Sequence, residues 1–262
     1  MGQLVDVSFS LISFEHFLLI LVRISLFVFV APFFSLRGIP NLTKIGFSAI
    51  LSIMILAAID PAEVTYGSTI QYGILVVKEA MTGVLLGYAT YICNSILLFA
   101  GNIIDMDIGL SMVSQFDPSM NTQVTVTGNL YFYFFMMMLL ATNGHQFIIR
   151  ALCDSFSLIP LGGAIFEWDV LLPGMVSFFT NLILIAFRIM LPIFSAILVM
   201  NVVLGIMAKV APQMHIFSIG VQLKIIVGFV ILMVMVTLFP QVVTLVVDQM
   251  RLNLRNFTEG MI

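Results

Sequence analysis

The residues best suited to chemistry in this sequence are a serine in a glycine-containing turn and two histidines distant from it. Ser111 lies in the pattern Gly109-x-Ser111, whereas His145 and His215 come much later in the chain. A serine hydroxyl becomes a nucleophile only when a base lies beside it. No sequence feature brings either histidine to Ser111, so we interpret the serine as a turn or cap residue. A Ser/His intramembrane hydrolase is kept only as an alternative.

The carboxylates and cysteines lack the spacing of a metal site. The pattern Asp105-x-Asp107-x-Gly109 resembles the start of a calcium-binding loop, but the later ligands and the closing glutamate are missing. Cys93 and Cys153 stand in apolar surroundings, without a second ligand at metal-binding spacing. We therefore predict no catalytic residue, no bound metal and no cofactor.

Five charged residues lie inside long apolar runs. An unpaired charge near the centre of a membrane-spanning helix costs roughly 3 kcal/mol or more. These side chains must therefore face protein or water. We expect them to form structural ion pairs between subunits, in preference to a direct role in transport. The residues are Arg23, Lys78, Glu79, Arg188 and Lys224.

The composition indicates a protein surrounded by membrane lipid. Of its 262 residues, 61% are hydrophobic and only 9% are charged, and the mean hydropathy is +1.17. Soluble domains are about half apolar and carry far more charge. The net charge of -3 and the absence of a basic block argue against nucleic acid as a partner.

Apolar runs predict an all-α integral membrane protein. A spanning helix needs about 20 apolar residues. The two longest runs, 175–207 and 217–247, predict a helical hairpin that bends near Pro192 and Pro240. Residues 147–158 have the period of an amphipathic helix. The other predicted helices cover residues 17–34, 45–59, 70–100 and 130–142.

Small residues mark positions where helices are expected to pack closely. Gly83 and Gly87 lie four residues apart, and Ala100 directly precedes Gly101. Small side chains allow two helix backbones to approach each other. We expect these four residues to serve helix packing and assembly.

A series of short motifs follows in a specific order between about Leu18 and Val243. They are Arg23 with Pro32 and Pro40, Gly83-x-x-x-Gly87, Ala100-Gly101, Gly109-Leu110-Ser111, Asp117-Pro118, Asn143-Gly144-His145, Ser155-Phe156 to Pro160, Gly205 to Pro212-Gln213, and Ile216-Phe217-x-Ile-Gly220. Each motif is weak alone, but their order is specific. In this order they resemble the FliR family, the R subunit of the flagellar type III export gate. His215 and Gln222 depart from the usual family pattern.

The resemblance implies a fold and a function. The fold is all-α with several long kinked hydrophobic helices, in which residues 1–174 are P-subunit-like and residues 175–262 form a Q-subunit-like hairpin and tail. The function is that of a non-catalytic gate subunit in the bacterial inner membrane, at the flagellar basal body. The implied partners are the P and Q subunits, the B subunit (a substrate-specificity switch protein) and unfolded flagellar export substrates. A secondary transporter, which also uses broken helices, and a virulence type III secretion subunit are the alternatives.

The polar segment 101–125 is interpreted as a plug in the implied channel. Irregular polar backbone at membrane depth is tolerated only against protein or a water-filled cavity. Two side chains are expected to block the channel, three carboxylates to hold the loop, and a glycine and a proline to shape its turns. These are Met112 and Phe116, Asp105, Asp107 and Asp117, and Gly109 and Pro118. An ordinary structured loop buried against partners is the alternative.

Overall fold

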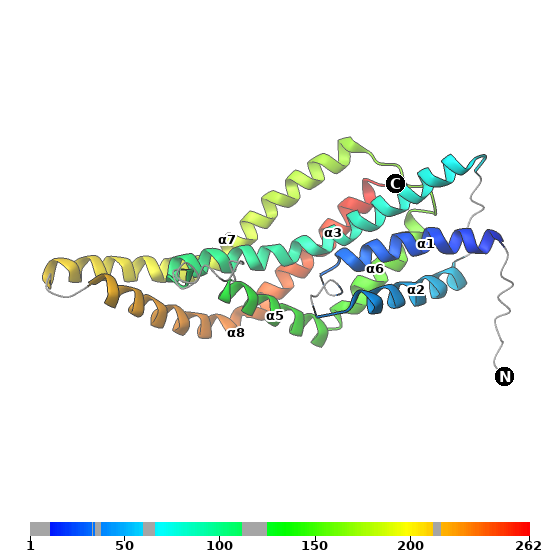
Figure 1. Ribbon diagram of the computed structural model, residues 1–262. Helices are drawn as coiled ribbons and strands as arrows, with labels where there is room; N and C mark the ends of the chain where they lie inside the picture. The colour runs from blue at the N-terminus through cyan, green and yellow to red at the C-terminus, as the bar shows by residue number, and fades with distance from the viewer. Residues whose placement is uncertain (1–10, 33, 35–37, 60–65, 112–124, 212–215) are drawn as a thin grey trace. The chain divides into compact units, whose positions relative to one another are not determined.

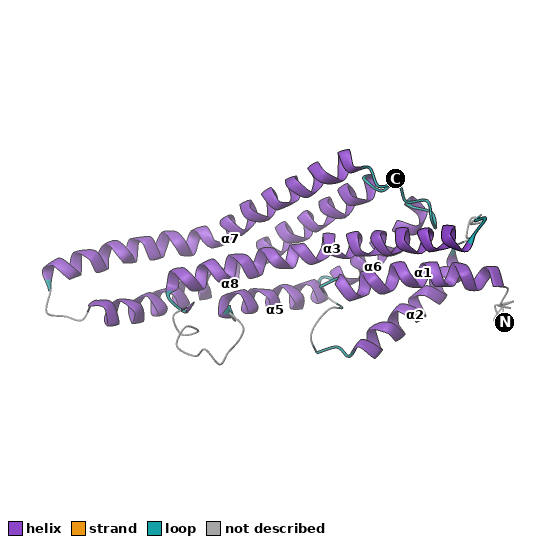
Figure 2. Ribbon diagram, turned by 45° about the horizontal axis from the view of Figure 1, so that its top comes forward, coloured by secondary structure: helices purple, strands orange, loops and turns teal. Residues whose placement is uncertain are grey.

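The computed structural model describes residues 11–32, 34, 38–59, 66–111, 125–211 and 216–262. These residues form a series of helices, and no strand occurs among them (Figures 1 and 2). The predicted all-α fold is therefore confirmed. The helices are α1 (Leu11–Val30), α2 (Asn41–Ala58), α3 (Thr69–Ile108), α5 (Val126–Ala141), α6 (Gly144–Leu158), α7 (Trp168–Val210) and α8 (Ile216–Glu259).

Four helices in the described part of the chain are long and apolar enough to span a membrane. They are α2, α3, α7 and α8, and the number rises to five if α5 and α6 form one broken span. A chain with this many apolar helices is a multi-pass membrane protein. The predicted hairpin helices are present and are longer than their apolar runs, because polar ends continue each helix.

The helices belong to two compact units that interleave along the sequence. Unit 1 contains residues 1–91, 145–175 and 252–262, and unit 2 contains residues 92–144 and 176–251. The boundaries fall inside α3, α7 and α8, so each of these helices contributes to both units. These units are defined by contacts alone, and the division into a P-subunit-like part, residues 1–174, and a Q-subunit-like part, residues 175–262, stays a prediction.

Unit 1 has an inverted arrangement of polar and apolar side chains on α2. Lys44, Ser48 and Ser52 are buried on its inner face, whereas Leu42 and Met54 are exposed on its outer face. The serine hydroxyls donate to the carbonyls four residues earlier, at 2.8 and 2.7 Å. Their polarity is therefore satisfied within the helix. An apolar outer face over a polar inner one suits a helix surrounded by lipid or by other apolar helices.

Unit 2 is held by aromatic and glycine contacts between α5, α3 and α8. The ring of Phe239 in α8 lies 5.4 Å from that of Tyr131 in α5. A Cβ placed on Gly228 of α8 would lie 2.7 Å from Ile108 of α3, so the glycine permits this close approach. Pro240 lies inside α8, and its expected bend, like that at Pro192 in α7, stays a prediction.

Helix α3 ends later than the sequence suggests. Residues 101–108, expected to begin the polar plug segment, form its last two turns. Gly109 ends the helix with φ +95°, and its backbone N–H donates to Asp105 O at 3.1 Å. Glycine adopts this left-handed conformation without a Cβ penalty, which makes it a frequent C-terminal cap. The two carboxylates at 105 and 107 are therefore helical, and the connection to α5 begins only at residue 109.

Candidate functional site

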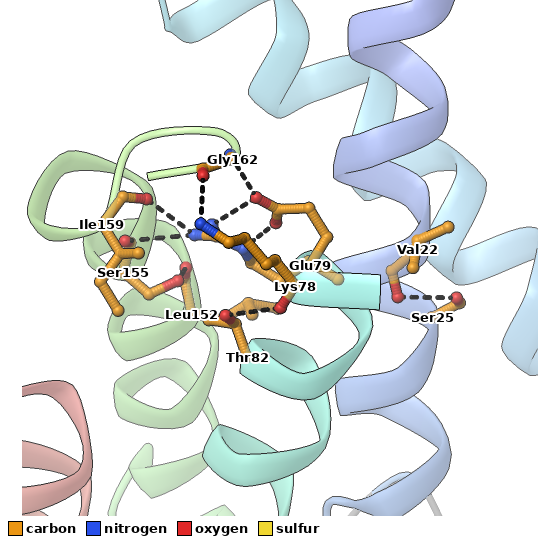
Figure 3. Close-up of polar contacts among 10 residues, drawn as sticks. Val22, Ser25, Lys78, Glu79, Thr82, Leu152, Ser155, Ile159 and Gly162 are labelled. Carbon is orange, nitrogen blue, oxygen red and sulfur yellow. Dashed lines mark hydrogen bonds and ion pairs between the residues drawn. The ribbon is translucent and has the colours of Figure 1, made fainter. Parts of the chain in front are cut away.

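The centre of unit 1 is a fully buried ion pair between α1 and α3. Arg23 Nε donates to Glu79 Oε2 at 2.5 Å, and Arg23 Nη2 donates to Glu79 Oε1 at 3.0 Å (Figure 3). Both side chains are 0% exposed. Two parallel hydrogen bonds between a guanidinium and a carboxylate fix both position and orientation. Two of the five charges found in the sequence thus neutralise each other inside the chain.

The remaining donors of Arg23 bind the end of α6. Arg23 Nη1 donates to Ser155 O at 3.3 Å and to Ile159 O at 3.1 Å, and the guanidinium carbon lies 4.4 Å from the Phe156 ring centre. The last carbonyls of a helix lack partners within the helix and carry partial negative charge. Ser155 O also accepts from the backbone N–H of Ile159 at 2.9 Å, so Arg23 adds a second donor there and supplies one to the Ile159 carbonyl, while it also pairs with the carboxylate of α3.

Glu79 also fixes the connection that follows α6. Its Oε1 atom accepts a hydrogen bond from Gly162 N at 2.8 Å, while Lys78 Nζ donates to Gly162 O at 3.5 Å. Gly162 has φ +72°, and an added Cβ would lie 2.6 Å from Leu75 Cδ2. Glycine adopts this conformation without strain and leaves the leucine its place. The cluster around Arg23 thus joins α1, α3, α6 and the link to α7 (Figure 3).

The Gly83 and Gly87 pair brings α1 close enough for this ion pair. A Cβ at Gly83 would collide with the backbone carbonyl oxygen of Arg23, and one at Gly87 would lie 2.9 Å from Val30 Cβ. The neighbour of both glycines is therefore α1 of the same chain. Close approach of the two backbones explains how the short Glu79 side chain reaches Arg23.

A second polar cluster joins α3 to the start of α5 in unit 2. Asp105 is buried, and its carboxylate accepts hydrogen bonds from the hydroxyl of Thr127 and from its backbone N–H, the latter at 3.2 Å. Thr125, the N-cap residue of α5, makes no side-chain cap hydrogen bond. Asp105 therefore caps α5 from a different helix, where a negative charge also interacts favourably with the helix dipole.

Small residues let the same two helices touch beside Asp105. A Cβ on Gly101 would collide with the backbone of Gly128. Ala100, next to it, is fully buried. The glycine contact and the Asp105 cap hold the end of α3 against the start of α5, so the two ends of the 109–125 connection are fixed together.

Comparison with known proteins identifies the family. The model of the bacterial export proteins, family 1, matches residues 14–250. The chain belongs to this family. The resemblance found in the sequence is thereby confirmed.

Named relatives of the family are similar over most of their length. The flagellar biosynthetic protein FliR of Bacillus subtilis is 29% identical over 245 residues, which cover 91% of this chain and 94% of the relative. FliR of Escherichia coli is 28% identical over 212 residues, or 79% of each chain. The surface presentation of antigens protein SpaR of Shigella flexneri is 26% identical over 214 residues, covering 80% of this chain and 82% of the relative.

The other predicted residues of this family member do not join the two clusters. Arg188 is exposed on α7. Asp107 is partly exposed, Lys224 of α8 attracts it electrostatically, and its Oδ2 atom lacks a hydrogen-bond partner among the described residues. Four of the expected plug residues lie outside the described residues. These are Met112, Phe116, Asp117 and Pro118, and His215 lies outside them as well.

The structure also corrects the expected pairing of the charges. Arg23 and Glu79 were expected to pair between subunits, but both partners lie within one chain. The groups that complete their site are the carbonyls of Ser155 and Ile159 and the backbone N–H of Gly162. The sequence does not reveal them, because almost any residue type supplies such backbone groups. In the described part of the chain, no group of three His, Cys, Asp or Glu side chains is arranged to hold a metal.

Proposed function

We propose that this chain is a non-catalytic subunit of the flagellar type III protein export gate in the bacterial inner membrane. The family match over residues 14–250 carries the proposal. Relatives from several bacteria bear the name flagellar biosynthetic protein FliR and align over most of both chains. The match to SpaR keeps a virulence secretion subunit as the second candidate.

The state of the buried charges supports a structural role over ion-coupled transport. Transport sites hold charged groups that can release or exchange a proton or an ion. Glu79 instead accepts three hydrogen bonds, two of them from a permanently charged guanidinium. All of these donors are fixed parts of the fold, so the carboxylate holds α1 and the Gly162 link against α3, which favours a scaffold over a secondary transporter.

We further propose that the P, Q and B subunits are the partners of this chain at the flagellar basal body and that unfolded flagellar proteins are the substrates. Residues 1–174 would take a P-like place and residues 175–262 a Q-like place in the gate. The 109–125 connection would be the plug, because the Asp105 cap and the Gly101 contact fix both of its ends to one place. An apolar constriction built from Met112 and Phe116 would resist ion leakage by dewetting.

Complementation tests the assignment. A strain of the source bacterium that lacks this gene should lose swimming and the secretion of flagellar proteins into the medium, and the intact gene should restore both. Loss of a virulence secretion activity with normal swimming would favour the second candidate. Normal swimming and secretion in the deletion strain would contradict both.

The plug has a separate test. Deletion of residues 110–115 should make the membrane leak ions and small molecules while the gate complex still assembles. The measurements are dye or ion influx into cells and co-purification of the complex. Unchanged permeability with normal assembly would mean that the segment is an ordinary buried loop.

A further inference from the structure

A buried lysine lies where the chain turns from α1 to α2. Lys44 belongs to the first turn of α2 and is only 8% exposed. Its Nζ atom lies 5.7 Å from the centre of the Phe29 ring in the last turn of α1. The two helices pack against each other, so this contact joins the end of one to the start of the other (Figures 1 and 2).

The ring contact leaves most of the bonding capacity of Lys44 unused. An ammonium group carries a full charge and three N–H donors. A distance of about 6 Å to the ring centre is the outer limit of a cation–π contact. Among the described residues, neither a carboxylate nor a carbonyl accepts from Lys44 Nζ. A buried charge without a counter-ion is costly, so Lys44 requires an anion.

The sequence around the turn does not supply this anion. The connection, residues 31–40, contains Arg37 and no acidic residue, and α2 contains none either. The nearest acidic residues along the sequence are Glu15 and Asp60. They belong to the opposite ends of the two helices, about 20–25 Å away at 1.5 Å per residue. We therefore expect the counter-ion of Lys44 to come from a bound molecule.

The start of α2 adds positive charge beside the lysine. Its N-cap residue, Pro40, makes no side-chain cap hydrogen bond, and its first turn has no acidic residue. The first N–H groups of a helix carry partial positive charge and bind phosphate-like anions. Helical side chains lean toward the helix N-terminus, so the ammonium of Lys44 lies toward these N–H groups. The buried cation and the uncapped helix end thus favour the same ligand.

Apolar side chains flank this charged place. Leu42 and Ile45 are 81% and 52% exposed on the outer face of α2. The rings of Phe34 and Phe47 stack at 5.1 Å one turn further along α2. A phospholipid has the two matching parts, a phosphate and acyl chains, whereas a free anion gains nothing from apolar neighbours. A zwitterionic headgroup would bring a second cation to a turn that has no acidic residue to receive it.

We propose that Lys44 and the start of α2 bind the phosphate of an anionic phospholipid, whose acyl chains lie along the outer face of α2. The ammonium donates to phosphate oxygens, and the Phe29 ring covers the other side of the cation. Basic pockets between membrane helices hold anionic headgroups in this way. The site is separate from the Arg23 cluster, and it does not depend on the proposed export function.

Lipid titration of the purified full-length protein tests the site. Native mass spectrometry should show phosphatidylglycerol bound to the wild type, and Lys44→Gln should raise the apparent dissociation constant about fivefold or more. Lys44→Arg should keep the affinity, because it keeps the charge. Lys209→Gln is the matched control, since Lys209 is an exposed lysine at the C-terminal end of α7, where no anion is expected to bind. Phosphatidylcholine should bind more weakly than phosphatidylglycerol.

Two further measurements keep the test valid if Lys44→Gln folds poorly. A photoreactive phosphatidylglycerol should label the start of α2 in the wild type, near Leu42 and Ile45. Phosphatidylglycerol should also raise the thermal unfolding midpoint of the wild type, because a ligand of the folded state stabilises it. Labelling only elsewhere, or equal affinity of a folded Lys44→Gln protein, would overturn the site. An equal effect of phosphatidylcholine, or of inorganic phosphate on the midpoint, would overturn the assignment to an anionic lipid.

Discussion

Replacing Glu79 by glutamine removes the carboxylate that, among the described residues, balances the buried guanidinium of Arg23. Glutamine is almost the same size, so the substitution changes charge and hydrogen bonding and little else. Glu79 accepts three hydrogen bonds, from Arg23 Nε, Arg23 Nη2 and Gly162 N. A glutamine offers a single acceptor oxygen and presents an NH₂ group to the other donors. At least one donor of Arg23 is then left facing another donor.

The expected cost is large because both side chains are fully buried. Breaking a buried ion pair by removal of one partner typically costs about 3–5 kcal/mol, since it leaves an uncompensated charge. Proteins are stable by only about 5–15 kcal/mol. For a chain of this size, each kcal/mol lowers the unfolding midpoint by about 2–4 °C, so we expect a decrease of about 6–20 °C. The assay is thermal unfolding of the detergent-purified protein, together with its steady-state amount in the membrane.

Two further variants separate charge from shape. The double substitution Arg23→Met with Glu79→Leu removes both charges, so it should be less destabilising than the sum of the two single changes. It should not reach the wild type, because the Ile159 carbonyl loses its donor. Arg255→Gln is the control, since Arg255 and Glu259 form an exposed ion pair at 2.7 Å whose loss should be undetectable. A Glu79→Gln protein that accumulates and unfolds like the wild type would refute the central role of the pair.

Other substitutions test the contacts around both clusters by the same unfolding assay. Gly83→Leu should destabilise by roughly 1–3 kcal/mol or more because it drives a side chain into the backbone of α1, whereas Gly73→Leu, with no atom within 4 Å of the added Cβ, should be tolerated. Asp105→Ala should cost about 1–3 kcal/mol by uncapping α5, and Asp105→Asn should cost less because the amide oxygen still accepts from Thr127. Gly162→Ala should cost about 1–2 kcal/mol, since alanine is strained at φ +72° and meets a leucine. Equal stability of Gly83→Leu and Gly73→Leu, or of the two Asp105 variants, would contradict these contacts.

The helix content could be predicted from the sequence because long apolar runs leave few alternatives in a membrane. The residue at which α3 ends could not be predicted in the same way. Asp105 and Asp107 indicate a loop by their polarity, but Asp105 is compatible with a buried helix once Thr127, 22 residues later, supplies its donors. A distant partner of this kind leaves no local signal. The glycine at 109 was the better indicator of the helix end, because its backbone conformation is a local property.

In the candidate site, too, the residue types could be predicted from the sequence, but their interaction partners could not. The buried charges were found because arginine and glutamate are conspicuous in apolar runs. Their pairing was missed because 56 residues separate Arg23 from Glu79 and every remaining acceptor is a backbone carbonyl. A local sequence signal exists only for Gly162, because the Leu161-Gly162-Gly163 sequence suggests a turn with unusual backbone angles.

Of the five charges first noted inside the apolar runs, the three that remain after the internal pairing are all positive. Once Arg23 and Glu79 neutralise each other, the apolar helices retain Lys78, Arg188 and Lys224, and Asp107 balances Lys224 in part. Lys78 and Arg188 then have no carboxylate among the described residues, yet apolar surroundings penalise both. The negative charge that balances them therefore lies beyond the described residues, whether in this chain, in headgroups or in other subunits.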